Sequence, residues 1–227
     1  TDGDEVNIDT SPAWLDDNTL VFARHPFREG GELAVELMKL NIADGSIETW
    51  VDLTSAGVRF VLGPLWQRSD GSLVFEADLL VDGRPLRQAM VVEQDGALRV
   101  VRTRESDHVM VVDANDDFLI AHDPRTFEYL YVALDGDSEA QSLFERFAIP
   151  EGHSNTANPI LGPRSDSILL ITENEKNQTF LLLIDDAEAT TVAELSKSPA
   201  AVSLSLVRNV VLVAGREHAW TIELKVS

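Results

Sequence analysis

The sequence SPAWLDDNTLVF (Ser11–Phe22) returns in altered form as GPLWQRSDGSLVF (Gly63–Phe75). Each stretch carries a proline and a tryptophan, then a polar turn, and then an apolar run. Asp, Asn and Gly suit such a turn because they tolerate left-handed backbone or hydrogen-bond to it locally. A bulky segment and an apolar run joined by a tight turn predict two short antiparallel strands.

The apolar run occurs five times, and this repetition indicates the architecture. The runs begin at Leu20, Leu73, Phe118, Ile168 and Val210, so their starts lie 53, 45, 50 and 42 positions apart. Most runs are followed along the chain by a second apolar stretch, then an acidic turn such as Asp44-Gly45, and then a last short stretch that could form a strand. Asp-Gly between apolar runs favours a hairpin. Four short strands in roughly 45 residues are typical of a β-propeller blade. We therefore predict an all-β fold, a five-bladed β-propeller of four-stranded antiparallel blades.

The predicted blades cover residues 11–53, 60–103, 107–145, 157–196 and 200–227, within a single domain of residues 1–227. The last unit shows no fourth strand, whereas Glu5–Ile8 alternates like a strand and precedes the first unit. We expect this N-terminal strand (5–8) to join the last blade and close the ring, which would satisfy exposed strand edges. The alternatives are a part of a six- to eight-bladed ring, or a sandwich or jelly roll. Helix is expected only as one turn within Ser138–Phe147.

These repeats resemble the WD40-like repeat of TolB-like β-propellers, which reads proline–x–tryptophan–serine–proline–aspartate–glycine before a strand. The first two units carry the resemblance, and the other three match in spacing and turn chemistry but lack the tryptophan. The resemblance implies that Trp14 and Trp66 wedge between blades. Members of that family serve as periplasmic interaction scaffolds or as accessory domains of peptidases, so the resemblance implies a fold and a periplasmic or extracellular location more than a reaction.

The composition excludes several classes of protein. The 227 residues contain 18 Lys and Arg against 39 Asp and Glu, a formal charge of −21, and no cysteine. Disulfides and cysteine-ligated zinc are therefore impossible. A nucleic-acid partner is not expected, because this charge repels phosphate. Membrane insertion is not expected either, because no apolar run approaches the roughly 20 residues that cross a bilayer.

Sequence motifs of catalysis are missing. The chain has no Gly-x-Ser-x-Gly nucleophile elbow and no glycine-rich phosphate loop, and its acidic turns lack the full pattern of a calcium loop. We predict no cofactor, no metal site and no catalytic residue. The alternatives are a catalytic propeller, either a metal-assisted hydrolase or glycosidase-like with Asp16, Asp107 or Asp113 on inner strands, and a fragment of a larger propeller accessory to a peptidase.

All five histidines fall in segments that a propeller would bring to one face. His25, His122 and His218 follow the second strands of their units, while His108 and His153 lie in the links between units. Arg28, Arg84 and Asp123 lie in the same loops. Loops on a rigid scaffold commonly carry binding residues. We therefore predict a non-enzymatic scaffold that binds a protein partner or a small ligand through this face.

Overall fold

The computed structural model describes residues 6–27, 34–101, 108–135, 139–164, 166–185, 188–195, 201–205, 210–214 and 219–224. These residues are mostly β-strand and form five antiparallel sheets. Their one α-helix, α1, covers only Leu143–Arg146, and no helix among them is long and apolar enough to cross a membrane. The prediction of an all-β fold built from four-stranded antiparallel sheets is confirmed.

The first three sheets each contain four strands in chain order. The first sheet consists of β1 (Val6–Trp14), β2 (Thr19–Phe27), β3 (Glu36–Asn41) and β4 (Ile47–Asp52). A 3-10 turn at Thr54–Ala56 leads into β5 (Val58–Gln67), β6 (Leu73–Val81), β7 (Arg84–Val92) and β8 (Leu98–Val100). The third sheet contains β9 (Met110–Ala114), β10 (Phe118–Asp123), β11 (Glu128–Ala133) and β12 (Gln141–Ser142).

The fourth and fifth sheets depart from this plan. In the fourth, the first strand is divided into β13 (His153–Asn155) and β14 (Ile160–Leu161), which both pair with β15 (Ser167–Asn174). β16 (Thr179–Asp185) and β17 (Glu188–Leu195) complete it. The described residues of the fifth sheet form β18 (Ala201–Ser205), β19 (Val210–Ala214) and β20 (Ala219–Glu223).

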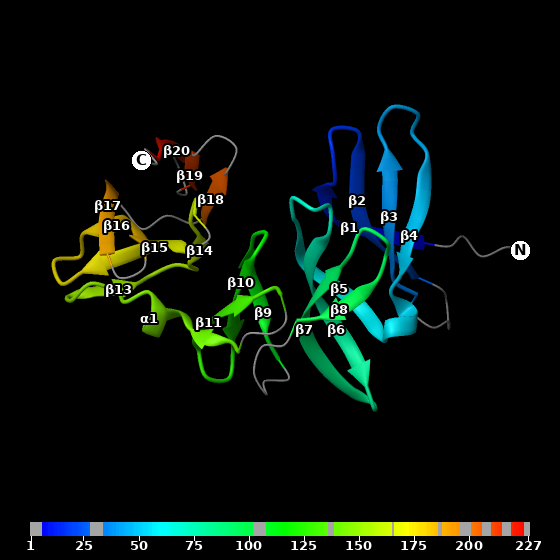
Figure 1. Cartoon of the computed structure of the whole chain (residues 1–227), viewed down its shortest axis with the longest axis horizontal. Helices are drawn as coiled ribbons and strands as arrows, with labels where there is room; N and C mark the ends of the chain where they lie inside the picture. The colour runs from blue at the N-terminus through cyan, green and yellow to red at the C-terminus, as the bar shows by residue number, and fades with distance from the viewer. Residues whose placement is uncertain are drawn as a thin grey trace, which may run out of the picture.

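The first strands of successive sheets are neighbours. β1 contacts β5, β5 contacts β9, β9 contacts β14, and β14 contacts β18. Figure 1 shows the sheets following one another around an arc, from the blue first sheet through the green ones to the red last sheet. This arrangement, with first strands inside and later strands outside, is the one that a propeller predicts. Closure into a complete five-bladed ring, and the extent of a single domain, stay predictions.

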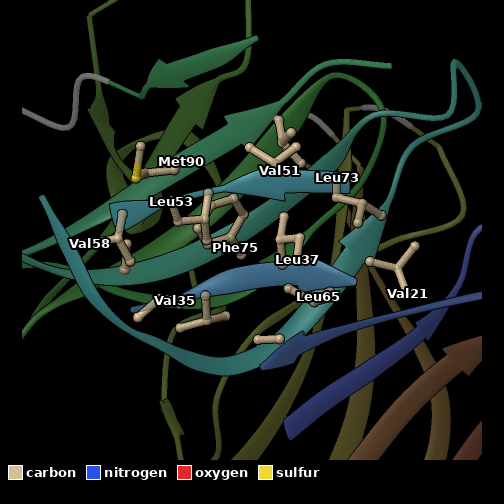
Figure 2. Packing of buried hydrophobic residues seen from close by; sticks show 14 of the residues in the cluster. Val21, Val35, Leu37, Val51, Leu53, Val58, Leu65, Leu73, Phe75 and Met90 are labelled. Carbon is tan, nitrogen blue, oxygen red and sulfur yellow. The ribbon is translucent and has the colours of Figure 1, made fainter. Parts of the chain in front are cut away.

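Apolar clusters fill the seams between neighbouring sheets, and strand alternation supplies both sides of each seam. On β6, Leu73, Phe75 and Ala77 face the first sheet, whereas Val74 faces the third. Figure 2 shows Phe75 surrounded by Leu37, Leu53 and Val58 in the first of these seams. Since the second, third and fourth sheets are covered on both faces, their strands are almost continuous apolar runs, which is why the repeat was visible in the sequence.

The two repeated tryptophans lie in different surroundings. In β1 the register shifts by one residue between Thr10 and Ala13, whereas in β5 it shifts by two between Leu62 and Trp66. A one-residue difference in register turns a side chain to the opposite face of the sheet. Trp66 therefore packs into the seam between the second and third sheets, as expected. Trp14 is 55% exposed, so the prediction that it wedges between blades is wrong.

The N-terminal strand also differs from the prediction. Val6, Asn7 and Ile8 pair with Phe27, Pro26 and His25 of β2, so they belong to the first sheet. The expectation that residues 5–8 complete the last sheet is corrected for Val6–Ile8, and Glu5 lies outside the described residues. The physical reason is that this segment continues through the bulge after Thr10 into the bulky segment at 11–14 and extends the same hairpin.

We expect Phe75→Ala to lower the free energy of unfolding by about 3–5 kcal/mol, because the ring is fully buried and its removal leaves a cavity. Leu80→Ala, on the same strand but 46% exposed, is the matched control and should change it by less than about 0.5 kcal/mol. Urea unfolding followed by tryptophan fluorescence measures both. Equal losses would contradict the assignment of Phe75 to a tightly packed seam.

Candidate functional site

The sheets have two distinct ends. We call the loop end the one that holds the connections between second and third strands, including Asp82-Gly83, residues 124–127 and residues 175–178, and the links between sheets. The turn end holds the connections between first and second and between third and fourth strands. The predicted binding residues His25, Arg84, His108, His122, Asp123 and His153 all belong to segments at the loop end. Arg28 and His218 lie outside the described residues.

The six described candidates are not one cluster. His25 is buried between the first and second sheets, where its ring packs on Phe60 at 5.5 Å between centroids. His108 forms a backbone bridge with Arg87 of β7. His153 Nδ1 lies 2.9 Å from Thr172 Oγ1, and its ring is next to Phe180. Within the described part of the chain, no three side chains of metal-ligating type are grouped closely enough to hold an ion.

His122 belongs to an aromatic cluster at the loop end of the third sheet. Its ring lies 4.8 Å from that of Tyr129 and 6.4 Å from that of Phe127. Tyr129 in turn contacts Phe144 and donates a hydrogen bond through its hydroxyl to Asn158 Oδ1 at 2.8 Å. The cluster therefore ties the third sheet to the fourth and gives the 124–127 turn a rigid base.

Asp123 builds this turn. The residue is 7% exposed, its Oδ1 accepts a hydrogen bond from Arg125 N at 2.8 Å, and its carbonyl oxygen accepts one from Phe127 N at 2.8 Å. Phe127 closes the turn with a φ of 59° and is 78% exposed. Left-handed backbone is unusual for a bulky residue and costs of order 1 kcal/mol. The structure thus holds a large apolar ring in solvent at a conformational cost.

Other apolar side chains are exposed at the same end. They come from three adjacent sheets: Ile8, Leu80, Val81 and Met110, besides Phe127. Leu80 and Val81 lie near the tip of the β6–β7 hairpin, which extends to the bottom of the molecule in the view of Figure 1. Exposed apolar groups that gather at one end of a molecule are typical of interaction sites. The turn end of the first sheet also exposes some, namely Trp14, Ile42 and Ile47.

Glu76 on β6 is a buried acid that the sequence prediction missed. Its Oε2 accepts a hydrogen bond from Val111 N at 3.1 Å, and its Oε1 lies 3.6 Å from Arg87 Nη1. Burial raises the pKa of Glu76, and the Val111 N–H and the Arg87 charge partly offset this effect. The available signal was an acid inside the apolar run that begins at Leu73, where the first unit has Ala23.

Asp113, a candidate for the glycosidase alternative, links three sheets. Its Oδ2 accepts a hydrogen bond from Leu161 N of β14 at 2.8 Å, and its Oδ1 accepts one from Ala114 N at 3.0 Å. The Trp66 side chain of β5 also hydrogen-bonds to it. Burial raises the pKa of Asp113 to about 6 although these donors favour the carboxylate. With its oxygens engaged, Asp113 holds neighbouring strands together. Asp107 lies outside the described residues.

Asp16 lies at the turn end, in the lining of a pocket of about 270 Å³ on the first sheet, with Lys39 and Glu48. Its Oδ1 accepts a hydrogen bond from Asn18 N at 2.8 Å. This bond is the main reason that the pKa of Asp16 is lowered. Asp16 is therefore a turn residue, as its sequence context suggested.

Comparisons with solved structures identify the architecture. A protein from Agrobacterium tumefaciens that is assigned as TolB superposes on this chain with a TM-score of 0.58 at 13% identity. The superposition covers 92% of this chain and 69% of that one. The β-propeller domain of the Trilobed protease from Pyrococcus furiosus, reported to have an open velcro topology, has a TM-score of 0.58 at 9% identity, over 97% and 70%. This chain has a β-propeller fold.

An acylaminoacyl peptidase from Pyrococcus horikoshii is a third similar structure, with a TM-score of 0.55 at 12% identity, over 95% of this chain and 38% of that one. No family model and no curated protein sequence matches the chain. At these identities the propeller likeness concerns the fold alone, so binding and catalysis have to be argued from the residues themselves.

The raised pKa of Asp113 predicts in which direction the stability of the protein changes with pH. The raised pKa means that the folded state holds this proton more tightly, so the contribution of Asp113 to stability falls as the pH rises from about 4 through 6. Asp113→Asn removes this contribution. We expect the stability of the wild type relative to the variant to fall by up to about 3 kcal/mol between pH 4 and 7. Urea unfolding at a series of pH values measures the difference, and a difference that is constant with pH would contradict the assigned environment.

Proposed function

We propose that this propeller is a non-enzymatic scaffold that binds a protein partner through its loop end, with Phe127 as the main contact. The observation that carries the proposal is the exposed ring of Phe127 in left-handed backbone on a rigid aromatic base. A buried aromatic anchor surrounded by weaker apolar contacts is the usual source of affinity at protein interfaces. Met110, which pairs with His122 beside the Phe127 ring, would supply such a surrounding contact.

The fourth sheet provides an internal comparison. There the equivalent turn has Asn177 in left-handed backbone, with a φ of 58°, and Asn174 Oδ1 accepts hydrogen bonds from Lys176 N and Gln178 N. Asn is well suited to this conformation. That turn is one residue shorter, because Asn177 N donates to the Asn174 carbonyl three residues back whereas Phe127 N donates to the Asp123 carbonyl four residues back. Both turns end in left-handed backbone, so this backbone conformation does not itself require Phe. A binding role explains why a costly residue is placed there.

The proposal includes a location outside the cytoplasm and a partner that is not a nucleic acid. The formal charge of −21 supports the second part, because it repels phosphate. The likeness to a TolB protein supports the first part. Hydrolysis of glycoside, lactone or peptide substrates by the purified chain would overturn the non-enzymatic part, and secretion of the native protein can be followed by cell fractionation.

Site-specific photocrosslinking tests the interface. We would place p-benzoylphenylalanine at position 127 and, as the matched control, at Ile42, which is 49% exposed at the turn end. In cells of the source organism, position 127 should give one discrete crosslinked product that excess wild-type chain competes away and the Phe127→Ala chain does not. Equal crosslinking from both positions, or no product from position 127, would argue against a loop-end interface.

Replacing Phe127 with Asn should separate stability from binding. Asn relieves the strained backbone, so we expect Phe127→Asn to raise stability by about 1 kcal/mol, or the melting temperature by about 2–4 °C. It should also abolish formation of the complex that the crosslink reveals. Ile42→Asn is the control and should leave the complex intact. A Phe127→Asn variant that is destabilised would mean that Phe127 serves the fold instead.

A further inference from the structure

The imidazole of His25 is enclosed at the seam between the first and second sheets. The residue is 4% exposed, and its ring packs against Phe60 of β5. Nε2 lies 3.2 Å from Thr10 Oγ1 of β1. Nδ1 is buried and has no hydrogen-bond partner among the described residues. The ring is thus hydrogen-bonded on one side only, in a place with very little exposed surface.

This arrangement accommodates the neutral ring and not the charged one. When Nε2 donates its hydrogen to Thr10 Oγ1, Nδ1 carries only a lone pair. Protonation would add a charged N–H donor at Nδ1, for which the described residues provide no hydrogen-bond partner, and a buried charge without a partner is strongly unfavourable. Burial accordingly lowers the pKa of His25.

The charged neighbours do not offset this cost. The charged residues on the packed elements are Asp9 on β1, Arg24 on β2, Glu36 and Lys39 on β3, Arg59 on β5, and Glu76 and Asp78 on β6. Asp9 acts to raise the pKa of His25, but less strongly than burial lowers it. Both oxygens of Asp9 accept hydrogen bonds from Arg24, at 2.8 and 2.9 Å, so its charge is largely neutralised.

We propose that His25 is an acid-sensitive lock on the seam between the first and second sheets at the loop end. In its neutral form it allows β1, β2 and β5 to stay packed, and protonation opens that seam while the other sheets stay folded. The inner strands are already irregular here, because β1 shifts register after Thr10 and Ser11 has a φ of 54°. The lock is a property of the fold and does not depend on the proposed partner.

The direction in which pH changes the stability of this seam follows from the linkage between proton binding and folding. A histidine whose pKa is lowered by folding contributes stability that is complete above its unfolded pKa of about 6.5 and is lost as the pH falls below that value. Asp113 acts in the opposite direction, since its raised pKa favours the folded state in acid. Acid should therefore weaken the first seam, while the strands around Asp113 are not weakened by that group.

Hydrogen exchange of the whole chain at pH 7.5 and 5.5, corrected for the intrinsic exchange rate, tests the lock. We expect opening of β1, β2 and β5 to become up to about tenfold more frequent at pH 5.5, with little change in β10 and β15. His25→Gln cannot become charged and should remove the pH dependence. His122→Gln, at the loop end of β10, is the matched control and should keep it.

Three results would overturn the proposal. Equal acceleration in all five sheets would indicate global destabilisation and not a local lock. Acceleration that persists in His25→Gln would assign the acid sensitivity to another group. A His25 pKa at or above 6.5 in the wild type, measured by NMR on histidine-labelled protein, would remove the basis of the lock even if His25→Gln failed to fold.

Discussion

Five inner strands lie side by side around the centre of this molecule, and the rest of the structure accommodates that crowding. Packed sheets prefer a separation of about 10 Å, so strands that converge have to bend or break. The register shifts in β1 and β5, it shifts again between β9 and β10, and the fourth sheet divides its first strand into β13 and β14. Pro12, Pro64 and Pro159 lie at three of these interruptions, where a missing N–H costs no ladder hydrogen bond.

At the interruptions, backbone N–H and C=O groups are left without a partner in their own sheet. Some of them form hydrogen bonds with a neighbouring sheet. The Ser11 hydroxyl donates to the Gly63 carbonyl, and the Leu161 N–H donates to Asp113. Each link joins equivalent regions of neighbouring repeats, 52 and 48 positions apart. Apolar packing alone would let neighbouring sheets slide, whereas these directional hydrogen bonds are lost if they do. The polar links therefore fix the position of one sheet against the next.

The sequence predicted the parts of this fold that depend on local chemistry. Strands and turns recur because Asp, Asn or Gly between apolar runs specifies a hairpin within a few residues. What it did not predict depends on pairing across the fold. Trp14 and Trp66 occupy the same place in the repeat, but one extra residue in the β5 bulge sends them to different environments. Val6–Ile8 has strand character, yet only the register with β2 decides which sheet it joins.

The same limit applies to the candidate site, because burial and backbone angle belong to the folded chain. The sequence placed the histidines at the loop end but could not separate the buried His25 from the half-buried His122.

A repeated sequence offers another signal, which is a position whose residue differs from the equivalent residue of the neighbouring repeat. His25 has Asp78 as its counterpart, Glu76 has Ala23, and Phe127 has an Asn in the next turn along. A core position that only had to pack would tolerate the same residue in each copy. Departures that place an orphaned imidazole, a buried carboxylate and an exposed strained ring in three neighbouring sheets indicate a demand other than folding. His25 and Phe127 lie toward the loop end, and Glu76 lies in the middle of β6.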